Sequence, residues 1–430
     1  MTAAATAPAA TTAGTSAAAP PSSVLRDRPY RRYLTGQSLS QLGDQVWWVA
    51  LSWTAVQLGS AGTAGLLLTV SSVPRLLLLL FGGVIADRYD IRRLMIGSDA
   101  ARVLVTLLAA GAVLLTPSLA VLAALAVVFG TVDALFLPAA GAMQPRLLRP
   151  EQYASGAVVA NMAARIALAL GAPLGGLVVA LGGVPLALVV DAATFAVSLG
   201  TLATVRPRPL PGAAGDAGSA APRPPRGSYL GDFRSGFAFL ARHRVLGPLT
   251  LVILLTNLGF VGPMNIGMAE LSADRGWGAG GIGLMLTGFG LGAAAGALLT
   301  TRLRSTRRPA LWITGCGAVE GVALLGTAFA PTLGLAVATT ALIGLCSGPM
   351  AVLCSVLTQR HTPDEFRGRV SSFNALISLG VVPLASAATG FAIAAVGLDR
   401  AYALCAALEA AGLLLLFAPG FRRAGIASAP

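Results

Sequence analysis

The chain has 430 residues, of which 55% are hydrophobic and only 11% are charged, and its mean hydropathy is +0.77. Soluble proteins carry about 25% charged residues, so this composition excludes an ordinary water-soluble globular protein. Within a bilayer only helices and closed barrels satisfy their own backbone. Barrel strands alternate apolar and polar residues, whereas residues 66–86 and 100–116 form apolar runs long enough to span as helices. The composition therefore predicts an all-α membrane protein.

The net charge of +13 comes from 30 arginines without any lysine. No basic helix or aromatic-basic patch gathers them, so the charge does not indicate nucleic-acid binding. The four cysteines lie in apolar runs without metal-ligand spacing, and we expect them to be small free hydrophobes. The sequence implies no metal and no cofactor, and we expect a monomer.

Residues 1–28 begin with an uncharged Ala/Thr/Pro-rich stretch that lacks the pattern of a signal peptide, and we expect a disordered cytoplasmic tail. Twelve apolar segments follow. They predict twelve transmembrane helices in two pseudo-symmetric six-helix bundles, residues 29–205 and 245–420, with a second cytoplasmic tail at 421–430. The segments are 34–58, 64–86, 94–116, 118–141, 156–181 and 184–205, then 246–270, 279–301, 309–330, 332–357, 369–396 and 400–420.

Residues 206–244 separate the two predicted bundles. The part from 206 to 231 is rich in Pro, Gly, Ala and Arg, which is typical of a flexible linker. In residues 229–244, Phe233, Phe237 and Leu240 recur at helical spacing beside arginines. This pattern predicts a short helix on the membrane surface.

The arginines also predict the orientation of the chain in the membrane. Twenty-five of the thirty lie in the termini or in the loops after the even-numbered segments, and the odd-numbered loops hold only Arg275 and Arg400. Because cytoplasmic loops of membrane proteins are enriched in Lys and Arg, both termini are expected in the cytoplasm, in a multi-pass protein of the cell membrane.

The two halves share residues at an offset of 213 positions. One interpretation is a six-helix duplication, an architecture of many secondary transporters; the other is chance identity in a low-complexity sequence. The matching pairs are Pro150 with Pro363, Glu151 with Asp364, Tyr153 with Phe366, and Asn161 with Asn374.

The stretches YRRYL at 30–34, GQSLSQLGD at 36–44 and GGVIADRYDIRR at 82–93 are distinctive. They resemble the major facilitator superfamily, and within it the drug:proton antiporter branch of macrolide- and enterobactin-type exporters. Residues 30–44 resemble the first helix of that branch, and residues 138–161 and 367–370 also match it. The stretch GGVIADRYDIRR at 82–93 resembles the signature loop between helices 2 and 3. The resemblance extends from about residue 28 onward.

This resemblance implies a cytoplasmic latch that holds the two halves in the outward-open state. Charged groups of the signature loop would bond across helices or to helix ends, and Asp99 with Arg102 would join them. The alternative is a solvated charge run that only sets topology. The latch residues are Gly83, Asp87, Arg88, Arg92, Arg93, Asp99 and Arg102.

The stretch GAPLGG at 171–176 resembles the helix 5 signature of antiporters, although the family has Gly where this chain has Ala172. Gly171, Pro173, Gly175 and Gly176 would bend the helix and allow tight packing against a partner. The resemblance implies export over uptake, and ordinary packing of a membrane helix is the alternative.

Charged residues inside the apolar segments are expensive and usually functional. Asp44, Asp133 and Arg165 lie at a similar predicted depth, and Arg75 is slightly deeper. We hypothesise that Asp44 or Asp133 binds and releases a proton, with Arg165 or Arg75 as its partner. A permanent structural ion pair is the alternative. Glu320 and Glu409 appear isolated, and the sequence assigns them no role.

In the superfamily, helices 1, 4, 7 and 10 line a central cavity, and Trp and Met side chains there suit bulky amphipathic ligands. Lipid-facing aromatics are the alternative for each Trp. The expected lining residues are Trp47, Trp48, Asn257, Met264, Asn265, Ser347 and Met350.

These expectations lead to a secondary active transporter that exports an amphipathic small molecule, such as a drug, antibiotic or secondary metabolite, by proton antiport. The alternative is a lysophospholipid or siderophore translocator of the same fold. A membrane enzyme is disfavoured, because the two histidines, His243 and His361, lie in predicted cytoplasmic segments. No GxxxxGK[ST] phosphate loop is present that would indicate ATP use.

Overall fold

The computed structural model describes residues 24–88, 90–116, 118–208, 229–303, 309–363 and 366–417, which are almost entirely helical. Most of the predicted tail 1–28, the tail 421–430 and linker residues 209–228 lie outside them. Nine helices in this described part are long and apolar enough to cross a membrane. The chain is thus an all-helical membrane protein, and the count of twelve crossings in two bundles stays a prediction.

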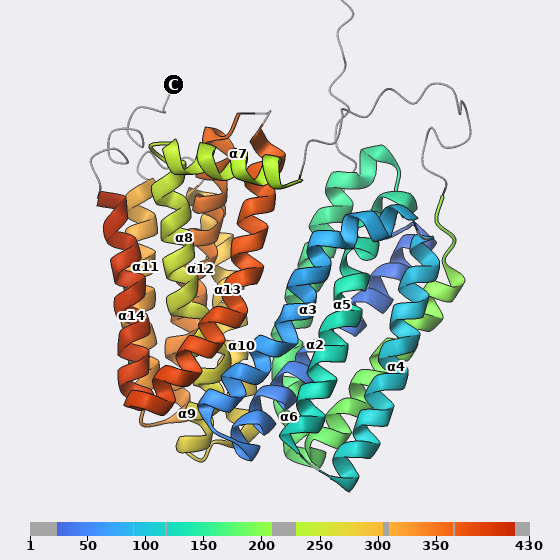
Figure 1. The fold of residues 1–430 in the computed structure, drawn as a ribbon, viewed down its shortest axis with the longest axis horizontal. Helices are drawn as coiled ribbons and strands as arrows, with labels where there is room; N and C mark the ends of the chain where they lie inside the picture. Colours follow the sequence, from blue (N-terminus) through green and yellow to red (C-terminus); the bar gives the residue numbers. More distant parts are fainter. Residues whose placement is uncertain are drawn as a thin grey trace, which may run out of the picture.

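Residues 28–204, here called the first half, form five long helices that lie together in Figure 1. Polar caps define where two of them begin: Asp90 accepts a hydrogen bond from the backbone N–H of Arg93, and Ser118 from that of Val121. The helices are α2 (Arg28–Leu58), α3 (Ala61–Arg88), α4 (Ile91–Leu115), α5 (Leu119–Leu147) and α6 (Tyr153–Thr204).

Helix α6 is broken at Gly182 and Gly183, and Gly183 adopts φ 65°, a conformation that favours glycine. This break falls between the predicted segments 156–181 and 184–205. Both arms of α6 pack on α2: Gly171 and Gly175 lie against residues 42–49, and Thr194 and Thr201 lie against Gly43 and Gly36. The chain therefore reverses at Gly183 and encloses α2 between two antiparallel arms.

Residues 229–417, the second half, hold the remaining helices, and Gly397 at φ 86° separates the last two long ones. One helix carries a π-helical segment, η2, beginning at Pro263, whose ring cannot supply a backbone N–H. The elements are α7 (Tyr229–Arg242), α8 (Leu246–Gly262), η2 (Pro263–Gly267), α9 (Met268–Asp274), α10 (Gly278–Leu303), α11 (Pro309–Ala328), α12 (Leu333–His361), α13 (Arg367–Val396) and α14 (Leu398–Leu414).

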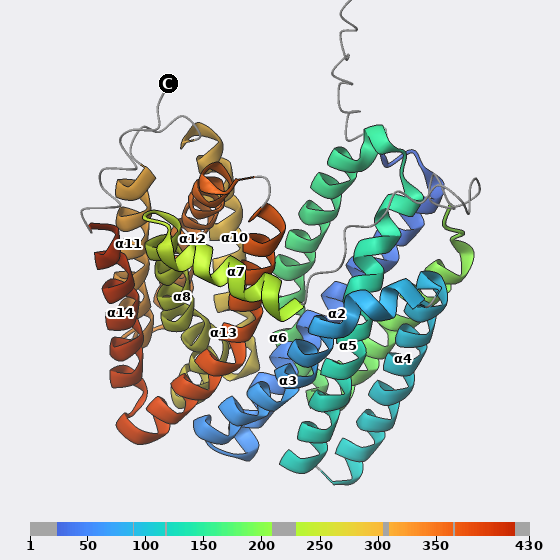
Figure 2. The same cartoon turned by 45° about the horizontal axis from the view of Figure 1, so that its top comes forward.

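The surface segment predicted at 229–244 forms α7, which lies across the ends of the long helices of the second half (Figures 1 and 2). Its Leu240 is buried with Leu246 and Val370. Phe239 stacks on Phe366 just before α13, with ring centroids 4.3 Å apart. The apolar face of α7 is thus anchored to the second half.

The two halves meet through glycines that allow backbones to touch. A Cβ on Gly65 of α3 would lie 2.6 Å from the carbonyl oxygen of Ser386 on α13, and a Cβ on Gly176 of α6 would lie 2.8 Å from that of Ala279 on α10. Gly283 of α10 is equally close to the carbonyl oxygen of Ala172. The GAPLGG motif therefore lies at a contact between the halves.

We expect Gly283→Ala to destabilise the protein by about 1–3 kcal/mol, because the added methyl overpacks this contact. The matched control is Gly280→Ala on the same helix, where a Cβ meets nothing within 4 Å. Thermal unfolding in detergent measures both. Equal unfolding midpoints for the two variants would contradict the contact.

A second prediction concerns His243, which joins α7 to α8. Its Nδ1 accepts hydrogen bonds from the backbone N–H groups of Val245 (3.2 Å) and Leu246 (3.1 Å). Burial, and then the nearby His361, lower the pKa of His243 below 6.5. The stabilisation of the junction between α7 and α8 by these hydrogen bonds is therefore complete above pH 6.5. It is lost as the pH falls through the lowered pKa of His243, because protonation of Nδ1 removes the acceptor.

Amide hydrogen exchange, corrected for its intrinsic pH dependence, measures this effect. Protection at residues 245–249 should fall more between pH 7.5 and pH 5.5 in the wild type than in His243→Asn, which keeps an acceptor that does not titrate. The same pH dependence in both proteins would show that His243 does not control the junction.

Candidate functional site

Helix α4 carries buried polar residues on one face. Ser98, Asp99, Arg102 and Thr106 follow helical spacing and are all buried, whereas Leu104 and Leu107 of the same helix are exposed. The exposed leucines suit contact with lipid. The polar face must therefore pack toward α5 and α6, which both contact α4.

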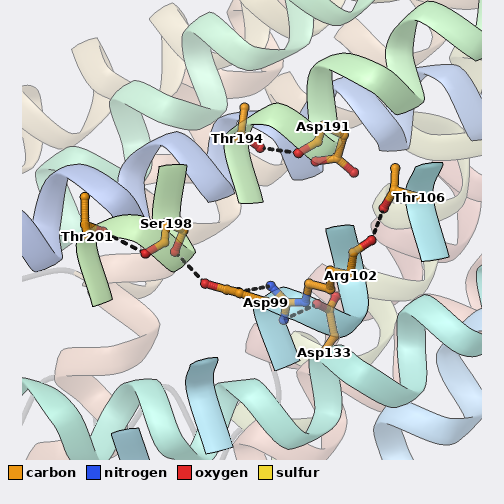
Figure 3. A network of polar contacts seen from close by, with 8 residues as sticks. All are labelled: Asp99, Arg102, Thr106, Asp133, Asp191, Thr194, Ser198 and Thr201. Carbon is orange, nitrogen blue, oxygen red and sulfur yellow. Dashed lines mark hydrogen bonds and ion pairs between the residues drawn. The ribbon is translucent and has the colours of Figure 1, made fainter. Parts of the chain in front are cut away.

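On that face a charge cluster forms from Asp99, Arg102, Asp133 and Ser198 (Figure 3). The Arg102 Nη2 atom lies 2.6 Å from Oδ1 of Asp133 on α5, and Nη1 lies 3.7 Å from Oδ1 of Asp99. Ser198 of α6 donates a hydrogen bond of 2.7 Å to Oδ2 of Asp99. The charge cluster thus links three helices of the first half.

Two aromatic rings surround the guanidinium group of Arg102. Its Cζ atom lies 4.3 Å from the ring centroid of Phe136 and 5.0 Å from that of Phe195. Such rings stabilise a desolvated cation through their π faces. One buried cation therefore faces two carboxylates, and the charge cluster carries a net negative charge when both are ionised.

Asp191 on α6 is a further buried carboxyl group, which sequence reasoning did not select as a site residue. It is 0% exposed and lies against Gly43 of α2. Neither of its carboxyl oxygens has a hydrogen-bond partner among the described residues. Figure 3 shows it on the same helix as Ser198, beside the charge cluster. Its position within an apolar segment was the available signal.

Asp44 and Asp133, the two carboxylates that the sequence selected, line the same small cavity of about 40 Å³. Trp47 and Trp48 form part of its wall. A polar cavity of this size holds a water molecule, for which roughly 10–15 Å³ suffices. The structure therefore brings the two predicted carboxylates to one cavity that is large enough for a water molecule.

A much larger cavity, of about 1140 Å³, lies in the second half and opens toward α6 of the first. Helices α8, α10, α12 and α13 supply most of its wall. Arg165 and Leu168 enter from α6, and Glu320 enters from α11. Aromatic residues Phe260 and Phe289 lie beside polar groups, so the cavity offers both apolar and charged contacts.

The partner predicted for Asp133 needs correction. Asp133 pairs with Arg102 instead of Arg165, because α4 packs directly on α5, whereas Arg165 is exposed to the large cavity. The side chains of residues 75–88, including Arg75, Asp87 and Arg88, and the surroundings of Gly83 lie outside what the structure describes.

The predicted cavity residues are divided between three environments. Asn257, Ser347 and Met350 line the large cavity, whereas Trp47 and Trp48 line the small one. Met264 is instead buried in an apolar core with Tyr402, and Asn265 is absent from the described cavity wall. Both follow Pro263, where the π-helical segment turns the face of the helix.

The structure also places the residues assigned to the latch in different environments. Asp99 and Arg102 belong to the charge cluster, within α4. Arg92 donates hydrogen bonds to the carbonyl oxygens of Leu202 (3.3 Å) and Ala203 (2.6 Å), at the end of α6. Arg93 is exposed. Arg92 therefore joins two helices of the same half, at a helix end as the sequence suggested.

Removing the cation tests the charge cluster. Arg102→Met should cost about 3–5 kcal/mol, because it leaves the buried Asp99 and the partly buried Asp133 without a counter-charge. Arg208→Met removes the ion pair with Asp27, where Arg208 is 52% exposed, and should cost about 1 kcal/mol or less. Unfolding in detergent compares them. Similar losses in both variants would mean that Arg102 is not the electrostatic centre of the first half.

Known proteins are similar to this chain in sequence. The profile of the Major Facilitator Superfamily matches residues 33–269 and 249–427. Among curated proteins, the chain is similar to the enterobactin exporter EntS of Escherichia coli O1:K1, with 27% identity over 319 residues, which cover 73% of this chain and 72% of that exporter.

Solved structures show the same fold at low identity. A bacterial homologue of the human lysosomal transporter Spinster, inward-facing and unoccupied, matches with a TM-score of 0.67 and 16% identity, covering 93% of this chain and 97% of that one. A bacterial homologue of the iron transporter ferroportin, also inward-facing, matches with a TM-score of 0.67 and 17% identity, covering 91% and 98%.

Proposed function

The chain belongs to the Major Facilitator Superfamily, and we propose that it is a secondary active transporter that exports amphipathic small molecules across the cell membrane in exchange for protons. The observation that carries this proposal is the combination of a large cavity, lined mainly by the second half and entered by Arg165 of the first, with a charge cluster of one arginine and two aspartates inside the first half. The cavity serves as the substrate site, and the carboxylates serve as the site of proton binding.

The wall of the large cavity supports an amphipathic substrate. Its volume of about 1140 Å³ is at or above the upper end of ligand pockets, roughly 300–1,000 Å³. Phe260 and Phe289, 5.7 Å apart between ring centroids, offer apolar contact. Arg165 is exposed there and suits an acidic group on the substrate.

The placement of contacts supports alternating access. The cavity wall on α13 runs from Val370 to Ser378, whereas the contact at Ser386 lies eight residues beyond Ser378, roughly 12 Å further along the helix axis. The halves therefore touch at one end, and the cavity lies toward the other. With the orientation predicted from the arginines, that other end faces the cytoplasm, where an exporter takes up its substrate.

The charge cluster supports proton coupling. Asp133 is bound to Arg102 on one side and borders the small cavity shared with Asp44 on the other. A proton that neutralises Asp133 weakens its bond to Arg102 and so loosens the link between α4 and α5. Proton binding and the packing of the first half are thereby connected.

A second candidate is a siderophore exporter of the same fold, and a specific observation favours it. The similar curated protein is named as an exporter of enterobactin, and Arg165 in the cavity wall suits an acidic ligand. A lysophospholipid translocator is the third possibility, and transport assays separate the three.

Everted membrane vesicles test the proposal. We expect the wild type to accumulate an amphipathic dye with an acidic group, or enterobactin, when a pH gradient is imposed, and to leave lysophospholipid in place. Asp133→Asn should reduce gradient-driven accumulation at least tenfold, because a neutral amide neither titrates nor holds Arg102 by charge. The control is Glu151→Gln, which changes an exposed carboxylate outside the cavities.

Two results would contradict the proposal. Full pH-driven accumulation in both Asp133→Asn and Asp44→Asn would exclude these carboxylates from proton coupling. Movement of lysophospholipid without accumulation of dye or enterobactin would replace the exporter with a lipid translocator.

A further inference from the structure

A second pair of acidic residues is buried in the second half. Glu320 of α11 is 2% exposed and Glu409 of α14 is 0% exposed. The two helices pack side by side in Figures 1 and 2. Glutamates are almost never fully buried without a partner, so two on facing helices in an apolar segment require a physical explanation.

The two carboxyl groups approach each other at the interface between α11 and α14. A Cβ on Gly321, the residue after Glu320, would lie 3.9 Å from Oε2 of Glu409. Glu409 is close enough to Glu320 for the two carboxyl groups to interact electrostatically. Gly259 of α8 makes room for Glu409, since a Cβ there would lie 3.2 Å from the Cβ of Glu409.

No described cation neutralises this pair. Oε2 of Glu320 and both carboxyl oxygens of Glu409 are buried without a hydrogen-bond partner in the described part of the chain. The titratable groups that face the pair are thiols, namely Cys316 of α11, Cys346 of α12 and Cys405 of α14. Helix α8 has no charged residue, and the charges of α12 and α13 are confined to the helix ends, at Arg360, His361, Arg367 and Arg369.

One member of the pair also reaches the transport pathway. Glu320 lines the large cavity, near Asn257 and Phe260 of α8, whereas Glu409 is absent from the described cavity wall. A buried carboxyl group with an unpartnered oxygen that borders a cavity is placed to exchange a proton with water there. Glu409 lies behind it and is shielded.

We propose that Glu320 and Glu409 form a second proton-binding site, which holds one proton between two carboxyl groups and exchanges it with the large cavity through Glu320. Two adjacent carboxylates without a cation repel each other and lose hydration, so a shared proton removes one charge and supplies a hydrogen bond. The exchange is a simple transfer: the carboxylic acid gives its proton to a cavity water, and the carboxylate remains.

This inference extends the proposed proton coupling to the second half, but it does not depend on the identity of the substrate. It also changes the interpretation of the two residues, which appeared isolated in the sequence. Release of the proton leaves the pair doubly negative at the cavity wall, so the proton occupancy sets the charge that an entering substrate meets.

Infrared difference spectroscopy of the purified full-length protein tests the site without any transport. A protonated carboxyl group has a C=O stretch separate from that of a carboxylate. We expect a protonated band near neutral pH that disappears at alkaline pH. Glu320→Gln and Glu409→Gln should each abolish or shift it, and Glu151→Gln, at an exposed position, should leave it unchanged.

A measurement on the wild-type protein does not depend on whether the variants fold. It also separates the signals of glutamates from those of the aspartates of the first half. In protein labelled with carboxyl-¹³C glutamate, the band should move to lower frequency, because it arises from Glu. A band that keeps its frequency on labelling, or that persists unchanged in the Glu320→Gln/Glu409→Gln double variant, overturns the proposal. Either result leaves the exporter function open, since Asp133 is tested separately.

Discussion

The cost of placing a charged side chain in hydrocarbon governs the arrangement of this molecule. An unpaired charge at the centre of a bilayer costs at least about 2.5–3.5 kcal/mol, so charges either remain in the loops or acquire partners inside. Twenty-five arginines remain in the loops and termini. Arg102 lies inside an apolar segment and has partners there: it lies between Asp99 and Asp133 and against two aromatic rings. The carboxyl groups in excess of the buried cations are where we propose that a proton binds.

The same charges organise the packing of the helices. Arg102, Asp133 and Ser198 come from three different helices, so α4, α5 and α6 are tied into one body. The contacts between the halves are of another kind: they are glycine-to-backbone contacts without charge, as at Gly65 and Gly176. Strong links within a half and neutral contacts between halves suit a transporter whose halves rock against each other.

Much of this could be predicted from the sequence, because hydropathy and arginine placement are read directly from composition. The apolar segments fall on helices, the membrane character and the superfamily are confirmed, and Asp44 and Asp133 reach one cavity. The pairing of the buried charged residues was harder to predict from the sequence. Which arginine meets Asp133 depends on the rotation of α4 about its axis, and the approach of Glu320 to Glu409 depends on packing between segments that are distant in the chain.

The π-helical segment at Pro263–Gly267 has a consequence for how the helix from Leu246 to Asp274 is used. An extra residue in one turn advances the side chains by about 100°. Residues before it, such as Asn257 and Phe260, face the large cavity, whereas Met264 and Met268 face the core. The two parts of this helix, before and after the π-helical segment, therefore present their side chains to different surroundings. A substitution before Pro263 therefore changes the cavity wall, whereas a substitution after it changes the packing of the core.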